Sequence, residues 1–312
     1  MYLTRTGVLV KPSDIPGDII HVSNPGVHSQ EEEKDKSFLL LCRVVNSEGI
    51  SGIQRAFLDH NYQITAVDQE PVLKGCGPCE TLGCEDGRLT EIEGVHYLAY
   101  TSAYQTNGGP WQSQISLAST TDLEHFERLG TILAELPRVK NGLIHSATIS
   151  RQFGIYYRPW HPRDQIWGAY SVNLTDWYGA RPVMSGRKGW WDGHHLGPGA
   201  PSIKTDDGWL SFYHGVDDSN TYHIGLALFD PDDPFKLLAR SLHPLISPLK
   251  PYEKFGRVPN VVFTCGAALV NDTVVIFYGA ADHCIAAAEI PLKKSFHQLK
   301  TVKPSYRVHW PR

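Results

Sequence analysis

The sequence predicts an all-β fold arranged as a five-bladed β-propeller, because one strand pattern recurs five times along the 312 residues. Each repeat begins with a short hydrophobic strand that runs into a polar, charged or small residue. A loop and a second strand of small residues follow. The first strands end at positions 43, 102, 158, 214 and 279, which are separated by 59, 56, 56 and 65 residues. Hairpins at such near-equal spacing, without helical patterns between them, are typical of propellers.

The expected strands follow the repeats in order along the chain. The first strands cover residues 38–43, 97–102, 154–158, 209–214 and 274–279, and their partners cover residues 52–58, 115–119, 166–171, 224–229 and 284–290. The 28 Gly, 21 Pro, 14 Tyr and 8 Trp suit a protein with many turns and strands. No linker interrupts the repeats, so we expect a single domain over residues 1–312 with an active site at its central axis.

Charge and hydropathy narrow the classes of partner. The net charge is −4 and no Lys/Arg cluster occurs, which argues against a nucleic-acid partner. No apolar run is long enough to span a membrane, and residues 1–6 lack the apolar core of a signal peptide. We therefore expect a cytoplasmic protein that acts on small molecules, and the sequence leaves a homo-oligomer open.

Two groups of residues are candidate metal ligands. Cys76, Cys79 and Cys84 form a C-x-x-C pair with a third Cys, but no fourth ligand lies at a suitable spacing, so we expect free thiols. His194 and His195 are adjacent, and successive side chains of a strand point in opposite directions, so both could not bind one ion. We expect no metal and no organic cofactor.

Polar residues occupy the same position in successive repeats. Arg43, Ser102, Arg158 and His214 end the first four strands, and Asp282 follows the fifth, whose end is a glycine. We take these strands as the innermost of each blade, so their ends should converge on the axis. Burying such residues without polar partners would cost several kcal/mol. The pattern therefore predicts a polar pocket on the axis.

Asp86 and Arg88 lie between the first two repeats. If residues 84–89 are extended, these two side chains share one face of the strand and Glu85 lies on the other. The pair is either a simple ion pair or a general acid held in place by a cation. Further along, residues 189–201 combine two Trp with His194 and His195, a mixture that suits sugar rings.

Taken together, these segments resemble glycoside hydrolase family 130, the β-mannoside phosphorylases and β-mannosidases. The matching segments are residues 24–27, 39–43, 83–88, 158–159, 205–216, 258–263 and 278–282. Their shared order and spacing cover most of the chain. The resemblance itself implies a five-bladed propeller.

The resemblance also implies roles for individual residues. Asp86 is similar to the catalytic acid, which in some members is proposed to deliver its proton through a hydroxyl of the mannosyl ring. Asn24, Arg43 and Asp282 resemble contacts to the mannosyl unit, and we add Arg88 and Ser102 as substrate-binding candidates. Arg158 and His214 resemble part of the phosphate pocket, which Lys140 and His195 complete.

Three departures from the family pattern concern the site. Gly87 stands where Pro is usual after the acidic pair, His145 and Ser146 stand where Phe-Pro is common, and His195 replaces a Lys. A neutral His is a poorer phosphate ligand than Lys, although an anion nearby would favour its protonated form. If His195 binds as a cation, phosphate affinity should weaken as the pH rises through neutrality.

An inverting hydrolase needs a second carboxylate as base, whereas a phosphorylase uses phosphate as the nucleophile and needs only the acid. Lys140, Arg158, His195 and His214 could form a cationic cup for that anion. We therefore expect an inverting phosphorylase that uses inorganic phosphate to cleave β-mannosides and releases α-mannose 1-phosphate.

Three alternatives remain open from the residues. A hydrolytic β-mannosidase could recruit Asp192, Asp217 or Asp218 as base. A non-catalytic sugar-binding propeller would use the strand-end residues only to bind hydroxyls. A furanoside-cleaving propeller would need three carboxylates around the axis, and the sequence offers only Asp86 and Asp282 as candidates. The loops 104–111 and 160–165 are expected to shape the side of the pocket that holds the leaving sugar.

Overall fold

The computed structural model describes residues 3–31, 36–106 and 108–301, and strands dominate it. The two α-helices have only four and five residues, α1 (Pro251–Lys254) and α2 (Leu292–Phe296). Two short 3-10 turns cover Pro12–Asp14 and Pro78–Glu80. Within these residues no helix is long and apolar enough to cross a membrane. The all-β prediction is confirmed.

The strands form four hydrogen-bonded sheets that follow one another along the chain. The largest has nine strands: β2 (Ile19–Glu31), β3 (Lys36–Asn46), β4 (Ser51–Leu58), β5 (Ile64–Val67), β6 (Leu73–Lys74), β7 (Gly83–Ile92), β8 (Val95–Tyr104), β9 (Gln112–Thr120) and β10 (Glu127–Ile132). Only one parallel residue pair, Ser51 with Gly83, joins β4 to β7. The sheet therefore consists of two units, β2–β6 and β7–β10.

The other three sheets have four, six and four strands. The next sheet holds β11 (Val139–Ile144), β12 (Phe153–Pro159), β13 (Gln165–Ser171) and β14 (Trp177–Ser185). The following one holds β15 (His195–Pro198), β16 (Ile203–Thr205), β17 (Gly208–Val216), β18 (Tyr222–Phe229), β19 (Leu237–Ser241) and β23 (Leu299–Thr301). The last one holds β20 (Val262–Val270), β21 (Thr273–Ala280), β22 (Cys284–Pro291) and β1 (Thr4–Val10).

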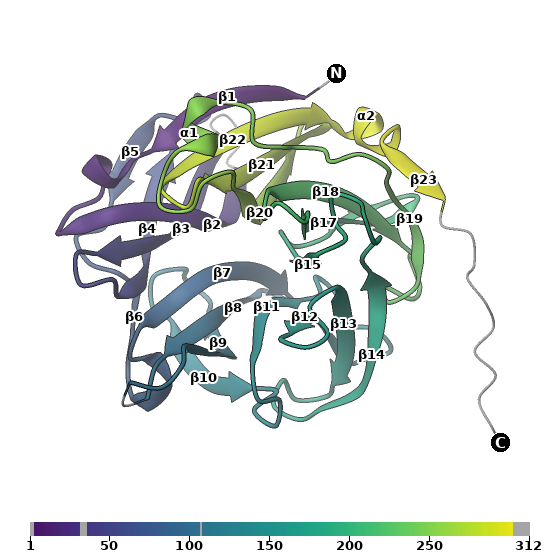
Figure 1. The fold of residues 1–312 in the computed structure, drawn as a ribbon, viewed down its shortest axis with the longest axis horizontal. Helices are drawn as coiled ribbons and strands as arrows, with labels where there is room; N and C mark the ends of the chain where they lie inside the picture. Colours follow the sequence, from purple (N-terminus) through teal and green to yellow (C-terminus); the bar gives the residue numbers. More distant parts are fainter. Residues whose placement is uncertain (1–2, 32–35, 107, 302–312) are drawn as a thin grey trace.

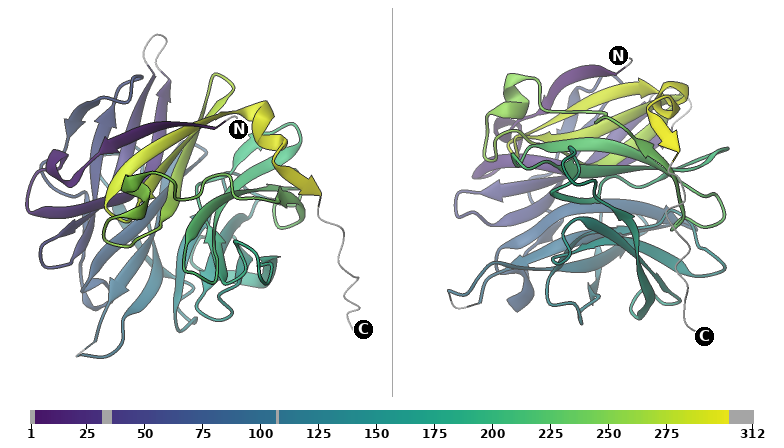
Figure 2. Two further views of the ribbon diagram at one scale, coloured as in Figure 1. Left: turned by 45° about the horizontal axis from the view of Figure 1, so that its top comes forward. Right: turned by 45° about the vertical axis from the view of Figure 1, so that its right-hand side comes forward.

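The first and last parts of the chain share a sheet. β1 pairs antiparallel with β22, and both views of Figure 2 show the purple strand beside the yellow ones. Figure 1 shows the sheets arranged around a common centre, toward which β2, β7, β11, β15 and β20 lie. Residues from distant repeats therefore meet at that centre.

All five predicted hairpins are present as antiparallel pairs: β3 with β4, β8 with β9, β12 with β13, β17 with β18, and β21 with β22. The expectation that their first strands are innermost is wrong. In each unit another strand, β2, β7, β11, β15 or β20, pairs with the predicted strand on its other side. Arg43, Arg158 and His214 therefore reach the centre from second strands.

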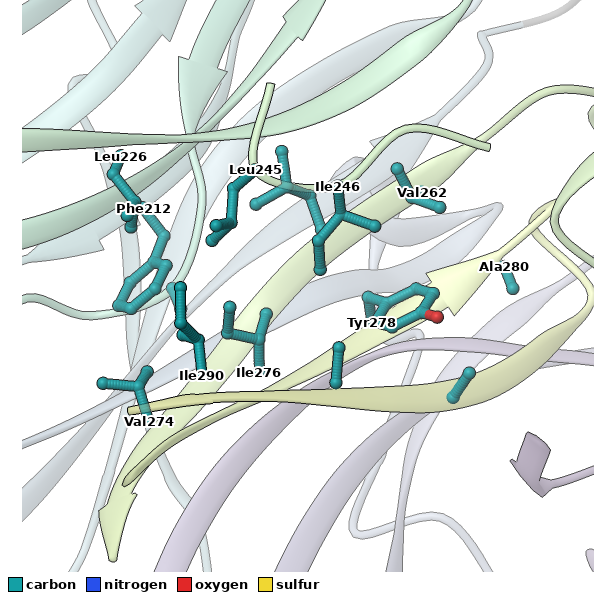
Figure 3. Close-up of a cluster of buried hydrophobic side chains, with 14 of the residues drawn as sticks. Phe212, Leu226, Leu245, Ile246, Val262, Val274, Ile276, Tyr278, Ala280 and Ile290 are labelled. Atoms are coloured by element: carbon teal, nitrogen blue, oxygen red, sulfur yellow. The ribbon is translucent and has the colours of Figure 1, made fainter. Parts of the chain in front are cut away.

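Apolar side chains fill the space between neighbouring sheets. In the cluster of Figure 3, Phe212 and Leu226 of one sheet pack against Ile276, Tyr278 and Ile290 of the next, and all are almost completely buried. Similar clusters join the other neighbouring sheets and units. Burial stabilises such contacts by about 25 cal/mol per Å² of apolar surface. This packing fixes the strand ends that carry the polar side chains.

Candidate active site

A pocket with a cavity volume of about 120 Å³ lies where the innermost strands meet. Seven predicted site residues line it: Asn24, Asp86, Lys140, Arg158, His195, His214 and Asp282. Five residues that the sequence did not single out complete the lining: Asn141, Tyr222, Val258, Val261 and Phe263. A pocket with many polar lining residues therefore lies where the inner strands of the five units meet.

Acidic groups and one cation form the first half of the pocket. Arg43 Nη2 donates to Glu85 Oε1 at 2.7 Å and Arg43 Nη1 donates to Asp86 Oδ1 at 3.4 Å. Arg43 Nη1 also lies 3.8 Å from Asp282 Oδ1. Asn24 Nδ2 donates to Asp86 Oδ1 at 2.8 Å. One guanidinium thus lies among three carboxylates in this half, which we call the acid half.

The acid half depends on irregular backbone. Asp86 has φ of 53° at a bulge in β7, where the pairing with β8 shifts between Glu85 and Arg88. The expectation of an extended segment, with Glu85 facing away from Asp86, is wrong for this reason. Because the bulge turns the strand, both carboxylates reach Arg43. Gly87 fits the bulge since a Cβ there would lie 2.9 Å from Leu98 Cδ1.

Asn24 sits in a second bulge, with φ of 47° on β2. Its side chain occupies the space where the strand-end residue of the fifth repeat would project. A Cβ on Gly279 would lie 2.0 Å from Asn24 Oδ1. The fifth repeat therefore ends in glycine because the position that other repeats give to a polar side chain is filled by Asn24.

The charges around Asp86 set its protonation state. Burial raises its pKa, but the positive charges of Arg43, Lys140 and Arg88 and the hydrogen bond from Asn24 outweigh burial and hold the pKa below its usual value. Asp86 is therefore a carboxylate in the unliganded protein at neutral pH. To act as an acid it must gain a proton when ligands bind.

Positive charges and neutral donors form the other half, which we call the cationic half. Arg158 Nε donates to Asn141 Oδ1 at 3.2 Å. Burial and the neighbouring guanidinium groups of Arg163, Arg138 and Arg88 lower the pKa of Arg158 to about 10. Burial also lowers the pKa of Lys140, although Glu85 and Asp86 oppose the shift. The cations here repel one another and lie partly out of water.

The two histidines of this half are neutral in the unliganded protein. Burial, with Arg158 and Arg163 nearby, lowers the pKa of His195 to about 3. Burial and Arg158 lower the pKa of His214 well below its usual value. His195 Nε2 lies 3.2 Å from the Tyr222 hydroxyl, and the His214 ring lies 4.6 Å from the Phe263 ring. The imidazoles therefore act as dipolar groups until an anion raises their pKa values.

Several buried polar atoms of the cationic half have no hydrogen-bond partner in the described part of the chain. They are Arg158 Nη1, Asn141 Nδ2 and His214 Nδ1. An unpaired buried polar group costs about 1–3 kcal/mol, and more if it is charged. Arg158 Nη1 and Asn141 Nδ2 are donors and border one pocket. The arrangement is that of a site for an anion, whose oxygens would accept these hydrogen bonds.

Three predicted substrate contacts, Arg43, Arg88 and Ser102, lie outside the pocket lining, and Arg43 contacts the lining residue Asp86 directly. Arg88 is fully buried and donates to the carbonyl oxygens of Gly199, Pro198 and Asp86, so it fastens β7 to the segment after β15. Ser102 is also fully buried, and its hydroxyl donates to Glu80 Oε1 at 3.0 Å. The side chains of Arg88 and Ser102 support the site rather than border it.

Other candidate carboxylates are engaged elsewhere. Asp192 is buried and bound by Arg187 at 2.7 Å and by the Tyr213 hydroxyl at 3.0 Å. Asp217 accepts hydrogen bonds from Ser219 and Thr221, and neither Asp217 nor Asp218 lines the pocket. Among the described lining residues, Asp86 and Asp282 are the carboxylates, and both belong to the acid half.

Aromatic rings and guanidinium groups form the rim beside the cationic half. The Trp111 and Trp160 rings lie 6.2 Å apart, and the Arg138 guanidinium carbon lies 3.5 Å from the centre of the Trp160 ring. Lys140 Nζ lies 4.9 Å from the centre of the Trp111 ring. The loops that the sequence suggests for the leaving sugar thus meet next to the pocket.

None of the six cysteines forms a disulfide; Cys76 and Cys79 are exposed, whereas Cys84 is buried. Burial raises the pKa of Cys84 to about 12. A buried neutral thiol of this kind is a poor metal ligand, so Cys84 does not complete a zinc site with the exposed pair.

Comparisons with known proteins agree with this site. Residues 20–301 match the glycoside hydrolase 130 family, described as beta-1,4-mannooligosaccharide phosphorylase. This chain belongs to glycoside hydrolase family 130. A 1,2-beta-oligomannan phosphorylase of Thermoanaerobacter sp. (strain X514) is 36% identical over 226 residues, which are 72% of this chain and 73% of the relative. A beta-1,2-mannobiose phosphorylase of the same strain is 38% identical over 72% of each chain.

Solved structures of the family extend the match to almost the whole chain. The structure of beta-1,2-mannobiose phosphorylase from Listeria innocua, in complex with beta-1,2-mannobiose, has a TM-score of 0.85 and 26% identity. The structural match covers 96% of this chain and 99% of the Listeria innocua chain. The family 130 relatives are enzymes, and so is this protein.

Proposed function

We propose that this family 130 enzyme is an inverting phosphorylase that cleaves β-mannosides with inorganic phosphate and releases α-mannose 1-phosphate. The two relatives and the solved structure act on β-1,2-linked mannosides by their names, so we propose β-1,2-mannobiose and longer β-1,2-mannans as substrates. Phosphate is the co-substrate, and no other cofactor takes part. The observation that carries the proposal is the cationic half with its unpaired buried donors, which faces Asp86 across one pocket.

In this mechanism the mannosyl unit lies in the acid half. Asn24, Arg43 and Asp282 hold its hydroxyls, and Asp86 supplies the proton that the leaving oxygen takes up, directly or through a mannosyl hydroxyl. Phosphate lies between Lys140 and Arg158 and attacks the anomeric carbon from the face opposite the leaving sugar, which inverts the configuration. The bond from the anomeric carbon to the leaving oxygen breaks as the bond to the phosphate oxygen forms.

Ligand binding can provide the protonated form of Asp86. A phosphate anion near Lys140 offsets one of the charges that hold the Asp86 pKa down. A bound sugar removes water from the carboxyl group, which favours its neutral form. Both changes raise the pKa of Asp86, so the acid is formed in the complex with both substrates. The same anion would raise the pKa values of His195 and His214.

We also propose that the five strand units form the blades of a five-bladed propeller within one domain. The units β2–β6, β7–β10, β11–β14, β15–β19 and β20–β22 with β1 follow one another around the centre in Figure 1. Pairing of β1 with β22 would then close the ring, as the first and last parts of the chain share one blade. The oligomeric state remains a prediction.

A panel of β-1,2-, β-1,3- and β-1,4-mannobioses, incubated with and without phosphate, tests the proposal. We expect α-mannose 1-phosphate only in the presence of phosphate and fastest from the β-1,2 isomer, with products identified by NMR. Faster turnover of another linkage would correct the substrate while keeping the phosphorylase. Free mannose in the absence of phosphate would instead indicate a hydrolase, and no turnover of any isomer would contradict both.

A further inference from the structure

Three side chains with metal-binding atoms meet outside the pocket. His28 is on β2, Glu91 is on β7 and His96 is on β8, directly opposite Glu91 in the β7–β8 pairing. His28 lies four residues beyond Asn24 on β2, roughly 13 Å along an extended strand. None of the three lines the active-site pocket. They therefore form a separate cluster between two neighbouring strand units.

The geometry of the cluster suits a shared ion. One ligand atom from each of His28, Glu91 and His96 can be chosen so that all lie within 4.8 Å of one another. The two imidazole rings are nearly perpendicular, with centroids 5.0 Å apart. His96 is 8% exposed, and its Nδ1 is buried without a hydrogen-bond partner in the described residues. A buried nitrogen of this kind is costly unless something binds it.

The protonation states favour a cation as the missing partner. Burial lowers the pKa values of both His28 and His96, so both imidazoles are neutral at physiological pH and offer lone pairs. Glu91 is exposed and gives an ion access from solvent. Two imidazoles and one carboxylate, with water in the fourth position, are a known ligand set for Zn²⁺.

We propose that His28, Glu91 and His96 form a binding site for a divalent transition metal of the Zn²⁺ class. Ligands about 2.1 Å from a tetrahedral ion lie roughly 3.4 Å apart, so binding draws the three side chains slightly closer. The exposed Glu91 and half-buried His28 side chains have room to adjust. The ion would clamp β2 to the β7–β8 hairpin, adding to the apolar cluster and the single β4–β7 backbone pair that join these two units of the sheet.

This site was not expected from the sequence, where no metal was predicted. Residues 28, 91 and 96 are far apart in the chain, and neither histidine belongs to a short ligand motif. The site holds no residue of the proposed catalytic machinery, so its role is stability rather than chemistry. It does not depend on the proposed function.

Zinc titration of chelator-treated protein, followed by calorimetry, tests the site. The exposed Cys76 and Cys79 are a competing pair of ligands, so the titration uses a Cys76→Ser/Cys79→Ser background. We expect one Zn²⁺ per chain and a rise in Tm on zinc addition, because a ligand that binds only the native state stabilises it. Loss of all zinc binding in this background would place the ion at the thiols and overturn the proposal.

Variants of the cluster locate the ion. We expect His28→Asn to weaken zinc binding at least 100-fold and Glu91→Gln, at an exposed position, to weaken it about tenfold. His125→Ala is the matched control, because His125 is an exposed imidazole that also faces a carboxylate, Asp122, at 2.8 Å. Equal zinc affinity in His28→Asn and His125→Ala would contradict the site, as would a cobalt spectrum with the strong bands of thiolate ligands.

Discussion

The two halves of the active-site pocket differ in how their charged side chains are paired. In the acid half, Arg43 lies between Glu85, Asp86 and Asp282, so each charge has an opposite partner. In the cationic half, Arg158 has an amide as its side-chain partner and like charges as neighbours. The carboxylates of the acid half have a cationic partner without ligand, whereas the cations of the cationic half lack an anion; Asn24 Oδ1 is the unpartnered buried atom of the acid half among the described residues.

The difference in charge pairing supports the proposal that phosphate binds in the cationic half. A buried site that collects cations and unpaired donors loses stability on its own and recovers it when an anion binds. The acid half needs no such partner and instead presents a prepared carboxyl group and fixed hydrogen-bonding groups. The structure is thus prepared for a neutral sugar on one side and an anionic nucleophile on the other.

Removal of a cation should have opposite consequences in the two halves. Arg43→Met leaves the buried carboxyl groups of Glu85 and Asp86 without their shared cation, and we expect the free energy of unfolding to fall by about 3–5 kcal/mol. Arg158→Met is the matched change in the cationic half. Because it relieves repulsion, it should lower the free energy of unfolding by no more than about 1 kcal/mol, or raise it.

Urea denaturation of both variants without phosphate makes this comparison. If Arg158→Met is as destabilising as Arg43→Met, the cationic half is held together by its own contacts and does not await an anion. That outcome would remove the main support for the phosphate site.

Asp86→Asn should cut turnover by a factor on the order of 10² or more, because an amide cannot supply the proton. The amide keeps the size of the side chain. Asp217→Asn is the control, since Asp217 is a carboxylate outside the pocket. The measurement is the rate of α-mannose 1-phosphate release at saturating phosphate. Retained activity in Asp86→Asn would show that another residue is the catalytic acid.

Anion binding should weaken at alkaline pH rather than at neutrality. Sulfate is a suitable probe, because it stays fully ionised across this range. In the unliganded protein His195, with a pKa of about 3, is already neutral at pH 6 and has no charge to lose between pH 6 and 8. Lys140, whose pKa is lowered, loses its charge as the pH rises through a value below that of an ordinary lysine.

Calorimetric titration of sulfate from pH 6 to pH 10 checks this profile. The affinity should fall as the pH rises toward about 10, the pKa of Arg158. The Lys140→Met variant should bind sulfate more weakly at every pH, and its affinity should depend less on pH because the lysine charge is absent. A steep loss of affinity between pH 6 and 7.5 that disappears in His195→Asn would show instead that His195 binds as a cation.

Ser102→Ala should have the smallest effect. The change removes the hydrogen bond to Glu80 and the contact with Ser116, and we expect a loss of about 1 kcal/mol in the free energy of unfolding. The KM values for mannoside and phosphate should not change. A clear rise in the KM for the mannoside would place Ser102 among the substrate contacts, as the repeat pattern suggested.

The sequence was sufficient to predict the five hairpins, because their strands are regular and strongly hydrophobic. It misassigned the innermost strands for a physical reason. β2, β7, β11 and β20 contain bulges, which interrupt the alternation of side chains that marks a strand. The strands nearest the chemistry were therefore the hardest to recognise.

Residue type and repeat position together indicated Arg158 and His214, which line the pocket, and Arg43, which contacts the lining residue Asp86. Asn141 was missed, although Asn141-Gly142 has the same form as Asp86-Gly87, an Asx residue with positive φ before a glycine. The Asn141-Gly142 pair is the sequence signal that could have identified Asn141 as a site residue. Ser102 was misplaced because its true partner, Glu80, is a buried carboxylate that no repeat pattern reveals.

The neutral state of His195 and His214 could not be read from the sequence either. It follows from burial beside Arg158, and both the burial and the contact arise only when distant repeats meet. Burial on this scale decides the protonation state of a histidine more strongly than its neighbours in the chain.

The most direct test of the central claim is the dependence of product release on phosphate. With β-1,2-mannobiose as substrate, the rate should rise with phosphate concentration from zero to saturation, and each bond cleaved should yield one α-mannose 1-phosphate and one mannose. Release of two mannose molecules per bond at a rate that does not depend on phosphate would contradict the account.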